Sequence, residues 1–281
     1  MPDPTRLLAT LQRAIDAFRA TPGRRGRVVH LEGAVDVLAA GDLHGNVENF
    51  RRLLHKADLA RNPGRHLVLQ EVVHGPFRYP AGGDRSHQLL DLIAALKCQH
   101  PRQVHFLIGN HELSQSTGRS IAKDEVELND LFIQGVRTAY GERADEVYAD
   151  YLRLIAAAPV AVRTPNRVFL SHSLPPMSRL ADFDAAVLER DESTEADCRP
   201  GGAIHALLWG RDIRPETAAA FLQKVDADLL ISGHIPNDHG FEAPNDRQLI
   251  LDSLAQPAAC CLLPADRPLT HAQLMQCVSL L

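Results

Sequence analysis

The chain has 281 residues, of which 45% are hydrophobic and 23% charged, and its net charge at neutral pH is −5. This composition is typical of a globular protein with a large core, and the negative charge excludes a general role in coating nucleic acid. No apolar run reaches the roughly 18 residues that a membrane span needs, and the N-terminus lacks the apolar segment of a secretory signal. The five cysteines have no metal-type spacing, so we expect a protein of the reducing cytoplasm.

The first predicted element is a helix over residues 5–20, within an N-terminal segment of 1–25, because apolar residues recur there at helical spacing. A repeating order follows, in which a short apolar run leads to a polar tip and then to a helical stretch. Helices are predicted to end near residue 59, to span about 86–97 and to fill most of 123–158. Strands are predicted over 28–31, 34–40, 67–69, 104–108, 160–162, 168–170, 229–231, 249–251 and 258–263.

This alternation predicts an α/β fold in which two sheets are stacked and helices lie outside them. We therefore expect a four-layer α/β/β/α sandwich with two mixed β-sheets flanked by helices, built as a single domain over residues 1–281. No internal repeat or long linker divides the chain.

Polar side chains follow four of the predicted strands, at the point where each strand ends. They are Asp42 and His44, Asn110 and His111, His172, and His234. A single histidine after a strand is more often a hydrogen-bonded structural residue, but four such tips, three of them beside glycine, favour a shared site. Carboxylate, imidazole and amide ligands without cysteine suit two divalent ions at a hydrolytic centre.

Two of these tips carry a family resemblance. Gly41-Asp-Leu-His-Gly45 and Gly109-Asn-His-Glu112 together resemble the motifs of the calcineurin-like metallophosphoesterases, and within them the phosphoprotein-phosphatase branch of Ser/Thr phosphatases and diadenosine tetraphosphatases. The resemblance extends from about residue 37 to 263, and residues 207–211 resemble the Leu-Leu-Trp segment of that family. The phosphodiesterase branch commonly has a second histidine two residues after His234, where this chain has Pro236.

The second motif of that family, GDxVDRG, is altered in this chain. Glu71 stands where the metal-bridging aspartate belongs, and the Asp-Arg pair is missing from its usual place. Residues 74–83 are rich in glycine and proline, and Asp84 and Arg85 then open a predicted helix. We interpret residues 74–83 as an inserted active-site loop that splits the motif, with Asp84 and Arg85 restoring its second half. The alternative is that Asp84 only caps the helix and Arg85 is a surface charge.

The resemblance implies a role for each of these residues. The implied metal ligands are Asp42, His44 and Glu71 for one ion, and Glu71, Asn110, His172 and His234 for the other. The ions would be two divalent metals, Mn, Fe, Zn, Ni or Co. The implied catalytic residues are His111 as the acid that protonates the leaving oxygen, Asp84 as the residue that orients its ring, and Arg85 and Arg211 as phosphate clamps. If Arg85 does not reach the metals, we expect His74 or Arg78 to take its place.

The implied function is the hydrolysis of phosphate monoesters, in phosphoproteins or small phosphorylated compounds, by metal-activated hydroxide. A nucleotide hydrolase of the diadenosine tetraphosphatase type would use the same centre. A pseudo-phosphatase that only binds phosphorylated partners is a third possibility, because the second motif is broken. The complete set of residues in the other motifs argues against it.

Overall fold

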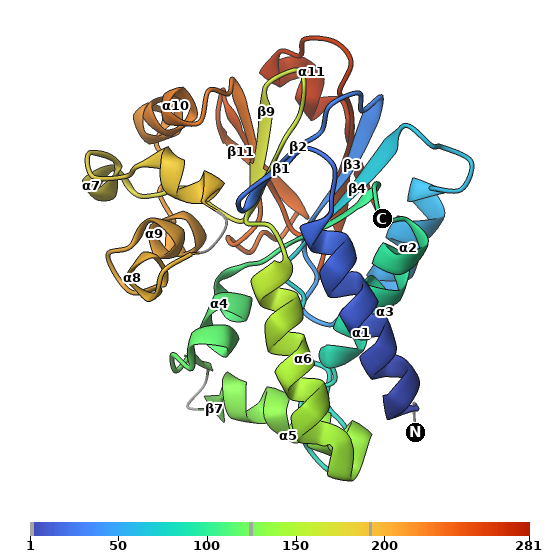
Figure 1. Cartoon of the computed structure of the whole chain (residues 1–281). Helices are drawn as coiled ribbons and strands as arrows, with labels where there is room; N and C mark the ends of the chain where they lie inside the picture. The colour runs from blue at the N-terminus through green and yellow to red at the C-terminus, as the bar shows by residue number, and fades with distance from the viewer. Residues whose placement is uncertain (1–2, 124–125, 191–192) are drawn as a thin grey trace.

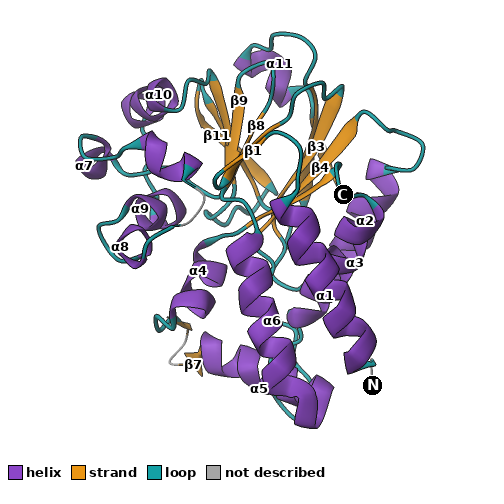
Figure 2. Cartoon of the chain, viewed as in Figure 1, coloured by secondary structure: helices purple, strands orange, loops and turns teal. Residues whose placement is uncertain are grey.

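The computed structural model describes residues 3–123, 126–190 and 193–281. Two mixed β-sheets lie at its centre, and helices pack outside them, which confirms the predicted architecture (Figure 1 and Figure 2). The larger sheet has the order β1 (Arg24–Arg25), β2 (Val28–His30), β8 (Ala161–Arg163), β9 (Val168–Ser171), β10 (Leu229–Ser232), β12 (Gln248–Leu251) and β11 (Phe241–Asn245). The smaller sheet has the order β14 (Val278–Leu280), β13 (Ala259–Pro264), β3 (Asp36–Asp42), β4 (Arg65–Gln70) and β5 (Val104–Leu107). A separate hairpin joins β6 (Ala122–Lys123) and β7 (Val126–Glu127).

Helices cover the outer faces of both sheets. Their bounds are α1 (Pro4–Arg19), α2 (Val47–Ala57), α3 (His87–Gln99), α4 (Asn110–Thr117), α5 (Leu128–Tyr140), α6 (Ala144–Ala157), α7 (Met177–Leu180), α8 (Glu195–Cys198), α9 (Ala203–Trp209), α10 (Pro215–Lys224) and α11 (His271–Met275), with 3₁₀ turns at Gly141–Arg143 and Ala185–Glu189. Helices α2 and α3 contact β4 and β5 of the smaller sheet, while α10 contacts β10 of the larger one. Helix α1 packs on α3 and α6. Among the described residues, none of the helices has the length and apolar character needed to cross a bilayer.

Strand β3 shows how the layers form. Alternate side chains of a strand point to opposite faces, and Val37 and Ala39 lie in the core between the sheets. Leu38 and Ala40 point the other way, into the core under the helices. All four are fully buried, which explains why residues 37–40 of this strand are all apolar and do not alternate with polar residues.

The topology brings the polar strand ends to one edge. Strands β3, β4 and β5 are parallel neighbours, so their carboxyl ends lie side by side, with residue 42 at the end of β3 and residues 71 and 110 shortly after β4 and β5. Strands β9 and β10 are also parallel neighbours, which places residues 172 and 234 together. The predicted active-site edge therefore has contributions from both sheets.

Candidate metal centre

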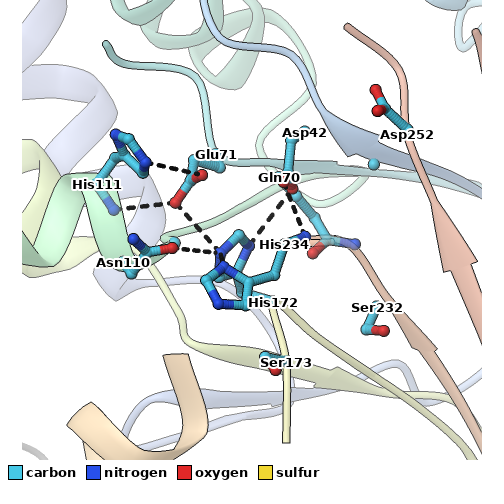
Figure 3. A network of polar contacts seen from close by, with 12 residues as sticks. Asp42, Gln70, Glu71, Asn110, His111, His172, Ser173, Ser232, His234 and Asp252 are labelled. Carbon is cyan, nitrogen blue, oxygen red and sulfur yellow. Dashed lines mark hydrogen bonds and ion pairs between the residues drawn. The ribbon is translucent and has the colours of Figure 1, made fainter. Parts of the chain in front are cut away.

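Glu71 lies at the middle of this edge, directly after β4 (Figure 3). Its Oε1 is 3.2 Å from Nε2 of His44, and its Oε2 is 3.3 Å from Nε2 of His172. The same Oε2 accepts the backbone N–H of His111 at 2.9 Å. One carboxylate thus faces imidazoles from two different strand ends.

A second cluster surrounds His172, which is fully buried. Its Nδ1 is 3.4 Å from Oδ1 of Asp42, and its Nε2 is 2.9 Å from Oδ1 of Asn110 and 3.0 Å from Nδ1 of His234. The other oxygen of Asp42 accepts the backbone N–H of His234 at 2.8 Å. The structure therefore brings together all six residues that the sequence singles out as ligands.

The donor set fits two divalent cations. His44, Glu71 and His111 offer ligand atoms within 4.8 Å of one another, and so do Asp42, Glu71 and His172, with Glu71 common to both groups. Within the six expected ligand residues, three buried polar atoms have no hydrogen-bond partner among the described residues: Oδ1 of Asp42, Nδ1 of His172 and Nε2 of His234. Buried polar atoms are normally satisfied, and a bound cation would satisfy these three ligand atoms together.

The charges of the centre also suit a cation. Burial opposes a charge on His44, but the carboxylates of Glu71 and Asp42 outweigh it and raise the pKa of His44 to about 10. Burial would likewise raise the pKa of Glu71, yet His172, His111 and His44 hold that pKa well below its usual range. Negative carboxylates therefore dominate the potential between the imidazoles. Nδ1 of His44 lies 2.8 Å from the carbonyl oxygen of Val73, which turns Nε2 toward Glu71.

The backbone at the centre adopts conformations that side chains rarely tolerate. His44, Glu71, His74 and His234 have positive φ angles of 39°, 27°, 61° and 69°. Such angles cost free energy for residues other than glycine, and they cluster at functional sites. Glycine is required at position 109, where a Cβ would lie 1.9 Å from Oε2 of Glu71.

His111 is oriented by His74, which lies in the segment between β4 and α3. The Nδ1 atoms of the two rings are 3.0 Å apart, and Nε2 of His74 is 2.7 Å from Oε1 of Gln115. Burial lowers the pKa of His74 to about 4, so its ring is neutral at neutral pH. Because an amide oxygen only accepts, Nε2 of His74 donates to it, and Nδ1 of His74 accepts from Nδ1–H of His111. Nε2 of His111 is left facing Glu71, 4.0 Å from Oε1.

The expectation that Asp84 orients His111 is corrected by these contacts. The buried carboxylate of Asp84 accepts the backbone N–H and the hydroxyl of Ser86, both at 2.8 Å, just before α3. It also lies 3.4 Å from Nη1 of Arg78. Asp84 shapes the loop and the start of the helix, since short side-chain bonds to residue 86 hold its carboxylate there.

Arg85 is also placed differently from the expectation. Its side chain is exposed, and its guanidinium lies 5.6 Å from the ring centroid of Tyr79. A cavity of about 720 Å³ opens onto the metal centre, and Arg78 and Arg211, but not Arg85, line it. Arg211 donates to the carbonyl oxygen of His234 at 3.1 Å. Leu128, Leu131 and Leu254 form an apolar part of the wall.

Asp252 is a residue of this cavity that the sequence analysis missed. It is buried, pairs with Asp42 as an isolated parallel bridge, and accepts the backbone N–H groups of Asn237 at 3.2 Å and Leu254 at 2.9 Å. The sequence does contain a signal for it, a polar residue at the end of an apolar strand, because Asp252 directly follows β12.

Glu112 holds the backbone around Glu71 and Gly109 in place through hydrogen bonds. Its carboxylate accepts the backbone N–H groups of Val72, Val73 and Gly109 at 2.8, 3.0 and 2.8 Å. Burial and the nearby charge of Glu71 raise the pKa of Glu112 to about 7. The side chain thereby ties the segment after β4 to the start of α4.

Comparison with known proteins identifies the family of this chain. A family model described as calcineurin-like phosphoesterase matches residues 35–238, and the chain therefore belongs to that family. A probable serine/threonine-protein phosphatase of Encephalitozoon cuniculi is 24% identical over 242 residues, which are 79% of this chain and 47% of the relative. Serine/threonine-protein phosphatase 5 of Arabidopsis thaliana is 22% identical over 232 residues, which are 76% of this chain and 38% of the relative. The chain thus spans about half the length of these relatives, or less.

Solved structures share the fold. A protein serine/threonine phosphatase from Saccharomyces cerevisiae, with similarity to human phosphatase PP5, superposes with a TM-score of 0.72 at 16% identity, covering 100% of this chain and 89% of that one. A cold-active protein-tyrosine phosphatase of a psychrophilic Shewanella has a TM-score of 0.58 at 15% identity, covering 88% and 78% of the two chains.

Proposed function

We propose that this chain hydrolyses phosphate monoesters, in phosphoproteins or small phosphorylated compounds, with two divalent metal ions. The observation that carries the proposal is the position of Glu71, whose carboxylate belongs to both groups of converging ligand atoms. A carboxylate shared in this way suits a pair of metal ions that bind one phosphate together. Membership of the calcineurin-like phosphoesterase family supports the same chemistry.

Asp42, His44 and Glu71 would hold one ion, and Glu71, Asn110, His172 and His234 would hold the other. When bound, the ions supply positive charge that polarises the phosphate and favours ionisation of a water. Arg78 and Arg211 line the same cavity, and their guanidinium groups bind the remaining phosphate oxygens. The apolar wall of Leu128, Leu131 and Leu254 packs against the leaving group and keeps bulk water away from it.

As an imidazolium, His111 donates its Nε2 proton to the leaving oxygen and becomes a neutral ring that keeps its proton on Nδ1, and His74 accepts from that Nδ1–H and holds the ring in place. His111→Asn is expected to lower kcat by roughly 10² to 10⁴. Metal content should not change, as measured by elemental analysis of the purified variant. Loss of one metal in this variant would instead show that His111 is a metal ligand. Its ligand atom lies close enough to those of His44 and Glu71 for that role.

The function is tested with a chromogenic phosphate monoester, assayed with Mn²⁺ and with a chelator. We expect metal-dependent hydrolysis that Asp42→Asn abolishes, because the change removes a charged ligand, whereas Asp16→Asn on the exposed face of α1 has no effect. Hydrolysis that survives chelation, or that Asp42→Asn retains, would contradict the proposal. So would cleavage of a dinucleoside polyphosphate without any cleavage of monoesters.

A further inference from the structure

Gln70, the last residue of β4, points into the space between the two sheets. Alternate side chains of a strand share a face, and Val68, two residues earlier, lies in the core between the sheets. The register of the smaller sheet pairs Gln70 with Asp42, after an irregularity in the pairing of β3. Figure 3 shows Gln70 beside Asp42 and near the strand end that carries His234. A side-chain amide therefore lies next to an expected metal ligand.

The orientation of this amide follows from its one hydrogen bond. Nε2 of Gln70 donates to the carbonyl oxygen of Ala40 at 3.1 Å. A carbonyl oxygen only accepts, so the nitrogen end of the amide must face Ala40 and the oxygen end faces another group. The side chain is fully buried, and its Oε1 has no hydrogen-bond partner among the described residues.

Oε1 of Gln70 and Oδ1 of Asp42 face the same glycine. A Cβ on Gly233 would lie 3.4 Å from the first oxygen and 2.2 Å from the second, so the absence of a side chain there keeps the space beside both oxygens open. Oδ1 of Asp42 also has no hydrogen-bond partner among the described residues. One of these buried oxygens belongs to a carboxylate and the other carries a partial negative charge, so placing them near each other is costly unless a positive group joins them.

The backbone next to these oxygens does not supply a donor for Oε1 of Gln70. The N–H of Gly233 donates to the carbonyl oxygen of His172 at 3.1 Å. The N–H of His234 donates to Oδ2, the other oxygen of Asp42, at 2.8 Å. Oε1 is thus a buried acceptor, held in a fixed direction, beside a carboxylate that is expected to bind metal.

We propose that Gln70 is an additional ligand, through Oε1, of the metal ion that Asp42 holds. The inference rests on the proposed function only in taking this centre to bind metal. Gln70 stands where the GDxVDRG motif has its first glycine, so the ligand has no counterpart in that motif. With Asp42, His44 and Glu71, the site then offers three kinds of oxygen and one imidazole nitrogen. Carboxylate and amide oxygens suit Mn²⁺, which makes Mn²⁺ the appropriate probe.

Titration of the metal-free protein with Mn²⁺, followed by calorimetry, tests the proposal. Gln70→Met keeps the length of the side chain but removes its oxygen, and it should weaken binding of one of two Mn²⁺ ions at least tenfold. Gln248→Met is the matched control, because Gln248 is a buried glutamine at the other end of β12 from Asp252, and its Nε2 donates to the hydroxyl of Ser232 at 3.1 Å. This control should bind both ions as the wild-type protein does. Unchanged Mn²⁺ binding in Gln70→Met would overturn the proposal.

Gln70→Glu separates the ligand role from the bond to Ala40. Both Gln70 variants lose the donor to Ala40, but the glutamate keeps an oxygen at the position of Oε1. We expect Gln70→Glu to bind two Mn²⁺ ions at least as tightly as the wild-type protein, while its metal-free form unfolds at a lower temperature because a second carboxylate then faces Asp42. Equal loss of Mn²⁺ binding in the two variants would assign the effect to the bond with Ala40 and overturn the ligand role.

A crystal structure of the Mn²⁺-loaded protein gives the direct measurement. Oε1 of Gln70 should lie within about 2.5 Å of an ion, as a coordinating oxygen does. A water between Oε1 and the ion would overturn the proposal. None of these measurements requires turnover. Gln70-dependent metal binding in a protein that hydrolyses no monoester would contradict the proposed function alone, whereas full metal content and activity in Gln70→Met would contradict the ligand role alone.

Discussion

The length of the Glu71 side chain decides which groups its carboxylate can reach. Oε1 lies near His44, and Oε2 accepts from His111 and lies near His172, so both oxygens are engaged on opposite sides. The segment carries a positive φ of 27° at Glu71 itself, and the close packing against Gly109 leaves no room for the carboxylate to shift. Position, rather than charge alone, makes Glu71 the centre of the site.

Glu71→Asp is therefore expected to weaken metal binding strongly, although it keeps the carboxylate. Shortening the side chain withdraws the carboxylate from His44 and His172 together, although the aspartate matches the motif that the sequence resembles. Metal affinity should fall by more than the roughly 10- to 100-fold that loss of an outer-shell partner costs. Elemental analysis after dialysis measures this, and Glu71→Gln should fall equally. Full metal content in Glu71→Asp would show that the backbone can adjust.

His74 is expected to act on kcat through His111. His74→Leu removes the acceptor for Nδ1–H of His111 and should lower kcat roughly 10- to 100-fold while KM and metal content stay unchanged. His74→Asn should restore much of the activity, because Oδ1 of asparagine takes the position of Nδ1 and asparagine tolerates the φ of 61° at this site.

Thermal unfolding of both His74 variants provides the control. A purely structural role predicts that kcat follows stability in the two variants. Equal kcat in His74→Leu and His74→Asn would contradict the positioning role. The sequence alone could not assign this role, because the partner of the His111 ring depends on how residues 74–83 fold.

At the scale of elements, residues 77–85 form a tight turn between β4 and α3. Tyr79 donates its backbone N–H to the carbonyl of Gly83 at 3.0 Å, and Arg78 pairs with Asp84 as an antiparallel bridge. Gly82 and Gly83 have φ angles of 90° and 87°, which this tight return requires. The bridge places Arg78 against the cavity, and the chain leaves the turn with Arg85 facing solvent.

Arg78→Ala and Arg85→Ala therefore form a matched pair. Arg78→Ala should raise KM for a phosphate monoester by about tenfold, the value of one charge-assisted hydrogen bond. Arg85→Ala should leave KM and kcat unchanged, since the exposed guanidinium contacts only the face of Tyr79 among the described contacts. Steady-state kinetics at saturating metal measure KM and kcat of both variants. A raised KM in Arg85→Ala with an unchanged KM in Arg78→Ala would instead support the interpretation that Asp84 and Arg85 restore the second half of the motif.

The elements that could be predicted are those with a continuous apolar run. Strands β3, β4, β5, β9 and β10 are buried on both faces, so their sequences identify them and their polar tips with them. Edge strand β11 could not be predicted from an apolar run, because it is half-exposed and contains Pro244. It is held in the sheet by antiparallel pairing with β12. Residues 128–140 and 144–157 are helical as expected, with a 3₁₀ turn between them that starts at Gly141, whose φ is 55°. The helical prediction is wrong for residues 123 and 126–127, which belong to the hairpin of β6 and β7. The helical prediction for residues 124–125 lies outside the described residues.

At the scale of the whole molecule, the metal centre depends on the packing of one sheet on the other. Asp42 ends one strand of the smaller sheet and Glu71 follows another, while His172 and His234 follow strands of the larger sheet. The core between the sheets, which includes Val68 and Leu170, fixes the distance between the two pairs. The sequence could indicate which residues stand at strand ends, but their separation across the sheets follows from side-chain packing and required the structure.

A buried lysine makes the stability of the whole fold depend on pH. Lys97 of α3 is fully buried, and its ammonium donates to the hydroxyl of Thr21 at 2.8 Å and to the carbonyls of Pro101 and Val104 at 2.7 and 2.9 Å. These bonds join the segment after α1 to the segments around β5. Burial, with a smaller effect of Arg24, lowers the pKa of Lys97 to about 7 from 10.5. The unfolded chain therefore binds more protons than the folded one between these two pH values.

The free energy of unfolding should accordingly rise with pH from about 7 toward 10 because of Lys97, and stay level below pH 7. From pH 7 to 9 this contribution is about 2 kcal/mol, since each pKa unit corresponds to 1.36 kcal/mol. Lys97→Met removes it, so urea unfolding of the wild-type protein and the variant should diverge by that amount over this range. Cysteines and tyrosines that titrate in the same range are common to both proteins and cancel in the difference. Parallel curves from pH 6 to 9 would mean that Lys97 keeps its proton in the core, held by its three oxygen acceptors.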